Sequence, residues 1–173
     1  MFVKIINIFF FTVFLFNNNN KNVWSAYNQN LNFPYEITFN EPIDYRTIIE
    51  PFIRLIMGYT TVSIEPKEFY WFAWDITKKP CRLVSLIEAQ QFNIGDGEGN
   101  KLYLNHVVTQ PKYEHQKIAS TLLERVEQYA WTNNFNVIEL YAPDDKRLYR
   151  KYGYKLKSQT GDQMFKKNPN LFT

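Results

Sequence analysis

The residues best suited to chemistry lie in one stretch of this sequence, from Leu102 to Ser120. Strand-forming residues run up to Pro111, a tight turn follows, and an amphipathic helix begins at Ile118. The start of a helix presents unpaired backbone N–H groups and the positive end of the helix dipole, and both attract anions. The turn is therefore a predicted phosphate-binding site. Its candidate residues are His115, Gln116, Lys117, Ile118, Ala119 and Ser120.

Two titratable side chains precede this turn. His106 lies in the strand that leads into it, and Glu88 lies in the strand expected beside that one. Histidine exchanges a proton near neutral pH, and a carboxylate can also accept one, so both residues are candidate general bases. The alternative for His106 is a histidine that only packs in its strand. Simple alternation places Asn105 and Val107 on one face and His106 and Val108 on the other. Which face meets a substrate stays open at this point.

Composition favours one folded domain and argues against several kinds of site. A chain of 173 residues is long enough for a substantial core, and its net charge of +3 gives no reason to expect a nucleic-acid partner. The single cysteine, Cys81, excludes an internal disulfide, and with only two histidines no metal site is expected. The glycine-rich segment 95–100 lacks the lysine and the spacing of phosphate or calcium loops, which predicts a hairpin turn.

The N-terminus differs from the rest of the chain. Residues 5–16 are almost entirely apolar and follow one positive charge, and small residues near Ser25 are suited to a signal peptidase. Residues 1–26 are thus a possible signal or export segment, and residues 27–34 are a polar linker. Twelve residues are too few to span a bilayer as a helix, which takes about 20. The protein is exported if this segment acts as a signal and cytoplasmic otherwise, and membrane contact is expected only through this segment.

Hydrophobic spacing predicts ten elements in the order β-α-β-β-β-α-β-α-β-β. Asp44 and Gly58 have the residue types that begin and end the first helix. The predicted strands are 35–39, 69–75, 82–89, 101–109, 135–141, 154–157 and 163–167, and the helices are 44–57, 118–133 and 143–152. This order predicts an α+β (mixed α/β) domain over residues 35–173, in which helices flank a mixed, mostly antiparallel sheet.

Two segments resemble a known family. Pro111 to Tyr113 with the helix start at Ile118, and Leu148 to Tyr154, resemble motifs of the GNAT superfamily of acyl-CoA-dependent N-acyltransferases. The resemblance covers about Tyr35 to Lys167, and it implies a GNAT-like fold in which the turn holds the pyrophosphate of coenzyme A. The family's acceptor site would correspond here to residues 56–67 and 158–163.

The turn departs from the family signature, Arg/Gln-x-x-Gly-x-Gly/Ala. Glu114 stands at the usual Arg or Gln, and Lys117 stands at the first usual Gly. Glu114 brings negative charge to a pyrophosphate site, and the Cβ of Lys117 obstructs the turn unless its ammonium contacts the anion instead. An Asn that often precedes the later motif is replaced by Ala142.

The resemblance also implies a reaction. An acetyl group would pass from acetyl-CoA directly to a primary amine of a small molecule or protein. Tyr149 would be the general acid at the sulfur, backbone N–H groups at Val107, Val108 and Thr109 would polarise the carbonyl, and His106 or Glu88 would be the base. The alternative is a GNAT-fold binding or exported module that no longer binds coenzyme A.

Overall fold

The computed structural model describes residues 34–58, 66–94, 99–143 and 146–171. All described residues belong to one compact unit, residues 34–173. The possible export segment, the linker up to residue 33 and the centre of the glycine-rich turn lie outside the described residues. No helix among the described residues is both long and apolar enough to span a membrane.

The predicted order of elements is confirmed, and every strand belongs to one seven-stranded sheet with the order β1-β2-β3-β4-β5-β7-β6. Among the described strands, only β4 and β5 pair in parallel. The strands are β1 (Tyr35–Phe39), β2 (Phe69–Asp75), β3 (Arg82–Ile94), β4 (Gly99–Thr109), β5 (Val137–Tyr141), β6 (Lys155–Leu156) and β7 (Gln163–Lys167). The helices are α1 (Glu50–Met57), α2 (Ile118–Thr132) and α3 (Arg147–Lys151).

The helical segment that contains α1 begins and ends at the residues that the sequence indicates, but its first turn is π-helical and α1 itself begins at Glu50. The Asp44 side chain accepts a hydrogen bond from the backbone N–H of Arg46 at 2.9 Å, and a π-helical turn, Tyr45–Ile49, leads into the helix. Gly58 ends it with φ of 70°, a left-handed conformation that is available to glycine without steric cost. The position of α1 over the sheet is thus fixed at both ends by local sequence.

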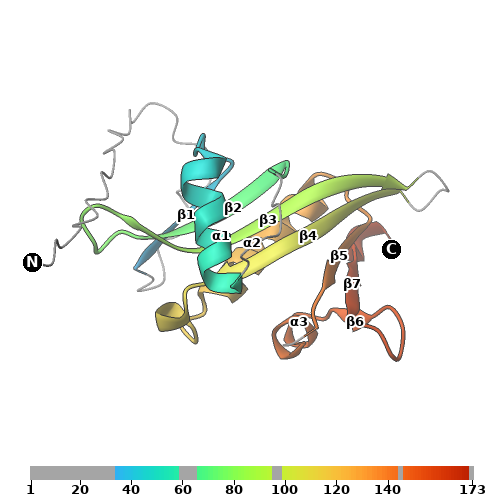
Figure 1. Cartoon of the computed structure of the whole chain (residues 1–173). Helices are drawn as coiled ribbons and strands as arrows, with labels where there is room; N and C mark the ends of the chain where they lie inside the picture. The colour runs from blue at the N-terminus through green and yellow to red at the C-terminus, as the bar shows by residue number, and fades with distance from the viewer. Residues whose placement is uncertain (1–33, 59–65, 95–98, 144–145, 172–173) are drawn as a thin grey trace, which may run out of the picture. The chain divides into compact units, whose positions relative to one another are not determined.

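The two longer helices cover opposite faces of the sheet, with α1 in front of β2–β4 and α2 behind (Figure 1). On the α1 face, Phe52 and Ile53 pack in one cluster with Phe72, Leu86 and Val108. On the α2 face, the Tyr129 ring lies 5.4 Å from the Trp71 ring. Successive residues 71 and 72 therefore point to opposite helices, as strand geometry requires.

One residue expected on the solvent face of α2 is covered. The side chain of Glu127 is only 13% exposed and forms an ion pair of 2.7 Å with Lys166 of β7. The helical spacing places Glu127 away from the apolar stripe, but the sequence gives no sign that β7 reaches it from the side. The expectation that Glu127 faces water was therefore wrong.

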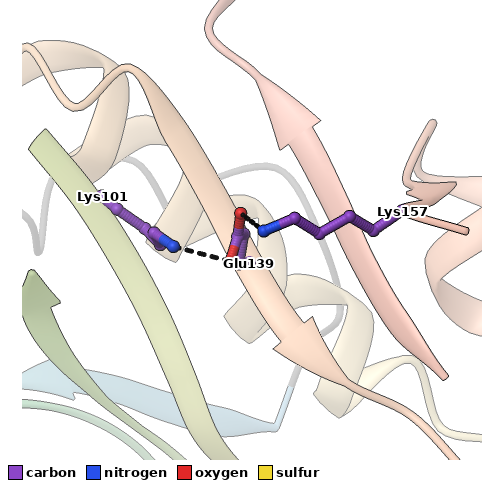
Figure 2. Close-up of polar contacts among 3 residues, drawn as sticks. All are labelled: Lys101, Glu139 and Lys157. Carbon is purple, nitrogen blue, oxygen red and sulfur yellow. Dashed lines mark hydrogen bonds and ion pairs between the residues drawn. The ribbon is translucent and has the colours of Figure 1, made fainter. Parts of the chain in front are cut away.

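Strands β4 and β5 pair at one end and separate at the other. The parallel register joins Lys101–Leu104 to Val137–Leu140 and stops there, while β4 continues to Thr109. At the paired end, Glu139 of β5 accepts hydrogen bonds from Lys101 of β4 at 2.8 Å and from Lys157, just after β6, at 3.0 Å (Figure 2). Beyond Leu104, one edge of β4 is left without β5 as its partner.

A β-bulge lies where the two strands part. Glu88 of β3 pairs with His106, and Ala89 pairs with Leu104, so Asn105 is an extra residue in β4. A bulge interrupts the two-residue alternation of a strand. His106 and Val108 share the α1 face, as alternation predicts, but the bulge breaks the alternation of β4 between Leu104 and His106.

Candidate active site

The turn before α2 is held in place by buried side chains. The Gln110 backbone N–H donates to the Val84 carbonyl at 2.8 Å, and the Tyr113 hydroxyl donates to Asp75 at 2.9 Å. The Tyr35 hydroxyl donates to the side-chain carbonyl of Gln116, whose amide in turn donates to the backbone of the turn. The side chain of Gln116 is therefore used inside the turn, and only its backbone N–H is available to an anion.

The turn adopts left-handed backbone conformations at two positions. His115 has φ of 61° and Lys117 has φ of 64°, although neither residue is glycine. A left-handed conformation costs an L-residue about 1–2 kcal/mol, and such strain gathers at functional sites. Lys117 thus takes the backbone conformation favoured by the glycine that the family signature has at this position.

These conformations leave the start of α2 unpaired. Lys117 supplies no side-chain cap, and its carbonyl accepts from the Ser120 and Thr121 hydroxyls at 2.8 and 2.9 Å. Within the described residues, the backbone N–H groups of Ile118, Ala119 and Ser120 form no hydrogen bond. These N–H groups lie at the positive end of a 15-residue helix, so the residues present suit a phosphate group.

Glu88 and His106 lie side by side on the α1 face. They are cross-strand partners, and Oε1 of Glu88 is 2.6 Å from Nδ1 of His106. The Glu88 side chain is fully buried, whereas 17% of the His106 side chain is exposed. An ionised Glu88 only accepts hydrogen bonds, so Nδ1 of a neutral His106 carries the proton and Nε2 carries the lone pair. This pair therefore joins a buried carboxylate to a partly exposed imidazole ring.

Two tyrosines lie near this pair: Tyr45 had no signal in the sequence, whereas Tyr70 is one of the aromatic residues that the sequence offers on the acceptor side. The Tyr45 hydroxyl and Oε2 of Glu88 are both buried, and neither has a hydrogen-bond partner among the described residues. Burial, and then the charge of Glu88, raise the pKa of Tyr45. Burial and the same charge raise the pKa of Tyr70 to about 12, against the opposing effect of a hydrogen bond from the Lys67 backbone. The hydroxyls of Tyr45 and Tyr70 come near Glu88 only in the folded chain.

Tyr149 lies on the other face of the sheet from His106. It is a buried residue of α3, and its ring meets the Tyr154 ring edge to face with centroids 5.9 Å apart. Tyr154 in turn lies against Lys166, which pairs with Glu127 of α2. The predicted acid and the predicted base thus belong to opposite faces of the sheet.

The three predicted backbone contacts lie on the part of β4 beyond the bulge. The Val108 side chain is buried in the α1 cluster, and the Thr109 hydroxyl lies 2.8 Å from the Ser85 hydroxyl. Val107 pairs with Ile87 of β3. The side chain of Val108 is therefore not available to a ligand, whereas Val107 and Thr109 are partly exposed. Within the described residues, no group of His, Cys, Asp and Glu side chains is arranged to hold a metal ion.

Known folds share this architecture at low sequence identity. A putative N-acetyltransferase from Lactobacillus plantarum superimposes with a TM-score of 0.60 at 14% identity, covering 78% of this chain and 98% of that one. An aminoglycoside acetyltransferase from an uncultured soil metagenomic sample, in complex with trehalose, gives 0.57 at 14% identity over 73% of this chain and 91% of that one. At these identities, the likeness shows the fold.

A third similar structure contains acetyl-CoA. It is a tyrosine-to-phenylalanine mutant of the toxin AtaT bound to the C-terminus of the antitoxin AtaR and acetyl-CoA, with a TM-score of 0.56 at 10% identity, covering 80% of this chain and 96% of that one. No curated protein sequence matches the chain. The profile of the Acetyltransferase (GNAT) family matches residues 23–154, which is more than half of the sequence. The chain therefore belongs to the GNAT acetyltransferase family and is an N-acetyltransferase.

Proposed function

We propose that this enzyme transfers the acetyl group of acetyl-CoA directly to a primary amine. The observation that carries the proposal is the turn before α2, where left-handed His115 and Lys117 leave three helix N–H groups unpaired. A strained backbone persists when the surrounding structure enforces it, and here buried Tyr35 and Tyr113 do so. The turn is organised for an anion before any anion binds.

Backbone groups of Lys117 to Ser120 would bind the pyrophosphate of the donor. Acetyl-CoA supplies the reactive thioester carbonyl when it is bound. The unpaired edge of β4 beyond Leu104 supports a contact between a backbone N–H of Val107–Thr109 and that carbonyl, since this edge has lost β5 as its partner. A fixed donor aimed at a carbonyl oxygen stabilises the negative charge that develops there.

His106 is the proposed general base, and Glu88 is its positioning residue. Nε2 of His106 takes a proton from the ammonium form of the acceptor, and the neutral nitrogen then bonds to the carbonyl carbon while the carbon–sulfur bond breaks. The new amide nitrogen loses its extra proton to solvent, and the thiolate leaves with coenzyme A. The carboxylate of Glu88 at 2.6 Å holds the ring in the required tautomer and stabilises the imidazolium that forms. Both residues belong to the sheet, so their geometry is set before the amine enters.

Tyr149 is the proposed general acid. Its hydroxyl would give a proton to the departing thiolate, and its place on the α2 face supports this role. Acid and base on opposite faces would act on the two ends of the reacting centre, with the gap between β4 and β5 as the passage between them. Such separation prevents the two groups from exchanging the proton with each other.

The alternative is a non-catalytic binding or exported module, and the observation that favours it is Glu114. This exposed carboxylate stands where the family signature has Arg or Gln, and it opposes the binding of a pyrophosphate. Residues 59–65 of the predicted acceptor segment 56–67, which include Tyr59 and Glu65, lie outside the described residues.

Calorimetry of the full chain with acetyl-CoA and with coenzyme A tests the donor site. We expect saturable binding that Glu114→Gln tightens by about fivefold, which corresponds to about 1 kcal/mol for one exposed charge. Glu124→Gln is the matched control, because Glu124 is an exposed carboxylate farther along α2, and it should leave the affinity unchanged. Binding weaker than millimolar in both variants would reject the enzyme in favour of the module.

A further inference from the structure

The small net charge of the chain hides a strong asymmetry. Residues 146–171 contain eight Lys and Arg residues and one acid, Asp162, so their net charge is +7, whereas the entire chain carries +3. Charge of one sign gathered in one part of a fold is a sign of a polyanionic partner. The sequence alone gives no reason to expect such a partner, because the N-terminal part of the chain offsets this charge.

The sheet gathers lysines and aromatic rings on one face. Cross-strand partners share a face of a sheet, and strands lie about 4.8 Å apart. One row across the strands places two lysines beside an aromatic residue, and the next row alternates polar and aromatic residues. The first row is Phe92, Lys101, Val137 and Lys167, and the second is Gln90, Tyr103, Glu139, Phe165 and Lys155.

Large apolar side chains on this face are exposed. Phe92 is 43% exposed, and Tyr141, which lies two residues beyond Glu139 on the same face of β5, is 58% exposed. At β6 and β7, a surface hollow of about 480 Å³ is lined by Gly153, Lys155, Phe165, Lys166 and Lys167. Exposed rings interleaved with cations are the surface that bases and phosphates of a nucleic-acid strand contact.

Glu139 reduces the charge of this face without cancelling it. Its carboxylate pairs with both Lys101 and Lys157, and the Lys157 side chain stays 49% exposed (Figure 2). Lys155 is exposed, and its side chain forms no hydrogen bond or ion pair with the described residues. The ion pairs hold the ammonium groups of two strands at fixed positions, while the face keeps a positive charge.

This surface continues towards the proposed base. On β3, Phe92 and Gln90 lie on the same side as Glu88 and Leu86, because residues two apart along a strand share a face. Leu86 packs in the α1 cluster, so the lysine-aromatic surface is the part of the α1 face that extends over β4, β5 and β7. A strand bound there would lie on the His106 side of the sheet.

We propose that this lysine-aromatic surface, which is made of Phe92, Lys101, Tyr103, Tyr141, Lys155, Phe165 and Lys167, binds a single-stranded nucleic acid. Phosphates would contact the lysines, and bases would stack on the rings, which tolerates any sequence. A second copy of the chain is disfavoured as the occupant, since it would bring like charges together. The proposal does not depend on the acetyl-transfer reaction, because binding is measured without acetyl-CoA.

Fluorescence anisotropy with a labelled oligouridylate of about 15 nucleotides tests the surface in the full chain. We expect a Kd of about 1–100 µM at low salt, and a log–log salt slope near −2 if about three lysines contact phosphates. Tyr141→Ala should weaken binding by about fivefold or more and leave the slope unchanged, because stacking carries no charge. Lys155→Gln should reduce the steepness of the slope by about 0.7.

The double variant Lys78→Gln with Lys79→Gln is the matched control. Both lysines are exposed in the turn between β2 and β3, away from this surface, so affinity should not change. Absence of binding at about 200 µM protein, or an equal loss in the control, would overturn the proposal. So would a dimer in sedimentation equilibrium that Tyr141→Ala dissociates, since the surface would then be a contact between copies. If Tyr141→Ala fails to fold, the salt slope of Lys155→Gln alone tests the proposal, and an unchanged slope would overturn it.

Discussion

The shared carboxylate of Glu139 should make a large contribution to stability for a single ion-paired residue. Its side chain is 11% exposed, and it pairs with Lys101, which is 16% exposed, and with Lys157, which is 49% exposed. A buried charge-assisted hydrogen bond contributes about 1.5–3 kcal/mol, and an exposed pair contributes less than about 1 kcal/mol. Glu139→Gln keeps the volume and removes the charge, so the free energy of unfolding should fall by about 2–3 kcal/mol.

Urea denaturation of the full chain measures this loss, and Glu50→Gln provides the comparison. Glu50 pairs with Arg54 one turn along α1, and both side chains are more exposed, at 25% and 28%. Such helical pairs contribute about 0.2–0.5 kcal/mol, so Glu50→Gln should be several times milder. A loss below about 0.5 kcal/mol for Glu139→Gln would refute the reasoning, because desolvation would then cancel the two ion pairs.

The stability difference between wild type and Glu139→Gln should also depend on pH. Burial alone would raise the pKa of Glu139, but hydrogen bonds and charges from Lys101 and Lys157 outweigh it and lower that pKa. A carboxyl with a lowered pKa in the folded state stabilises the protein above its unfolded pKa of about 4.3, and this contribution is lost as the pH falls. The stability gap between wild type and Glu139→Gln should therefore narrow below about pH 4.5.

Three further predictions concern the site. His106→Gln should lower kcat/KM by about 10²–10⁴, while calorimetry shows unchanged acetyl-CoA affinity, and retained turnover would exclude His106 as the base. Tyr149→Phe should lower kcat with the melting temperature nearly unchanged, because the ring still packs against Tyr154; an unaffected kcat would assign the proton to another donor. Lys117→Gly should change the free energy of unfolding by less than about 0.5 kcal/mol, since relief of left-handed strain offsets chain entropy. Lys117→Val should lose more than about 1 kcal/mol in the same urea titration, and equal effects would show that the turn is not strained.

The predicted strands that match the structure are those whose boundaries depend on local sequence. Strands 35–39, 69–75 and 163–167 have the predicted bounds, because alternation and turn residues mark both their ends. The neighbouring strands of Glu88 and His106 also follow from the order of the hairpins, and the structure pairs these two residues directly. Local patterns were therefore enough for the order of elements and for this pair.

Features that depend on distant contacts were missed. The bulge at Asn105 arises from the pairing of β3 with β4, and no single strand sequence contains that register. Tyr45 is affected by the charge of Glu88 only when the π-helical turn packs over the sheet. Glu127 is shielded from water by Lys166 of β7, which lies about 40 residues later in the chain. The +7 charge of residues 146–171 was visible in the sequence, but the gathering of Lys155 and Lys167 with Lys101 on one face of the sheet was not.

Strand β4 has a consequence for the exchange of amide hydrogens. His106 lies in a strand paired with β3 over ten positions, whereas the N–H groups of Ile118, Ala119 and Ser120, about a dozen residues later, are bonded to nothing among the described residues. Exchange with D₂O should therefore be slow at His106 and rapid at the start of α2. A bound donor would slow exchange only at the second place, so one deuterium-labelling time course reports separately on the catalytic strand and on the donor turn.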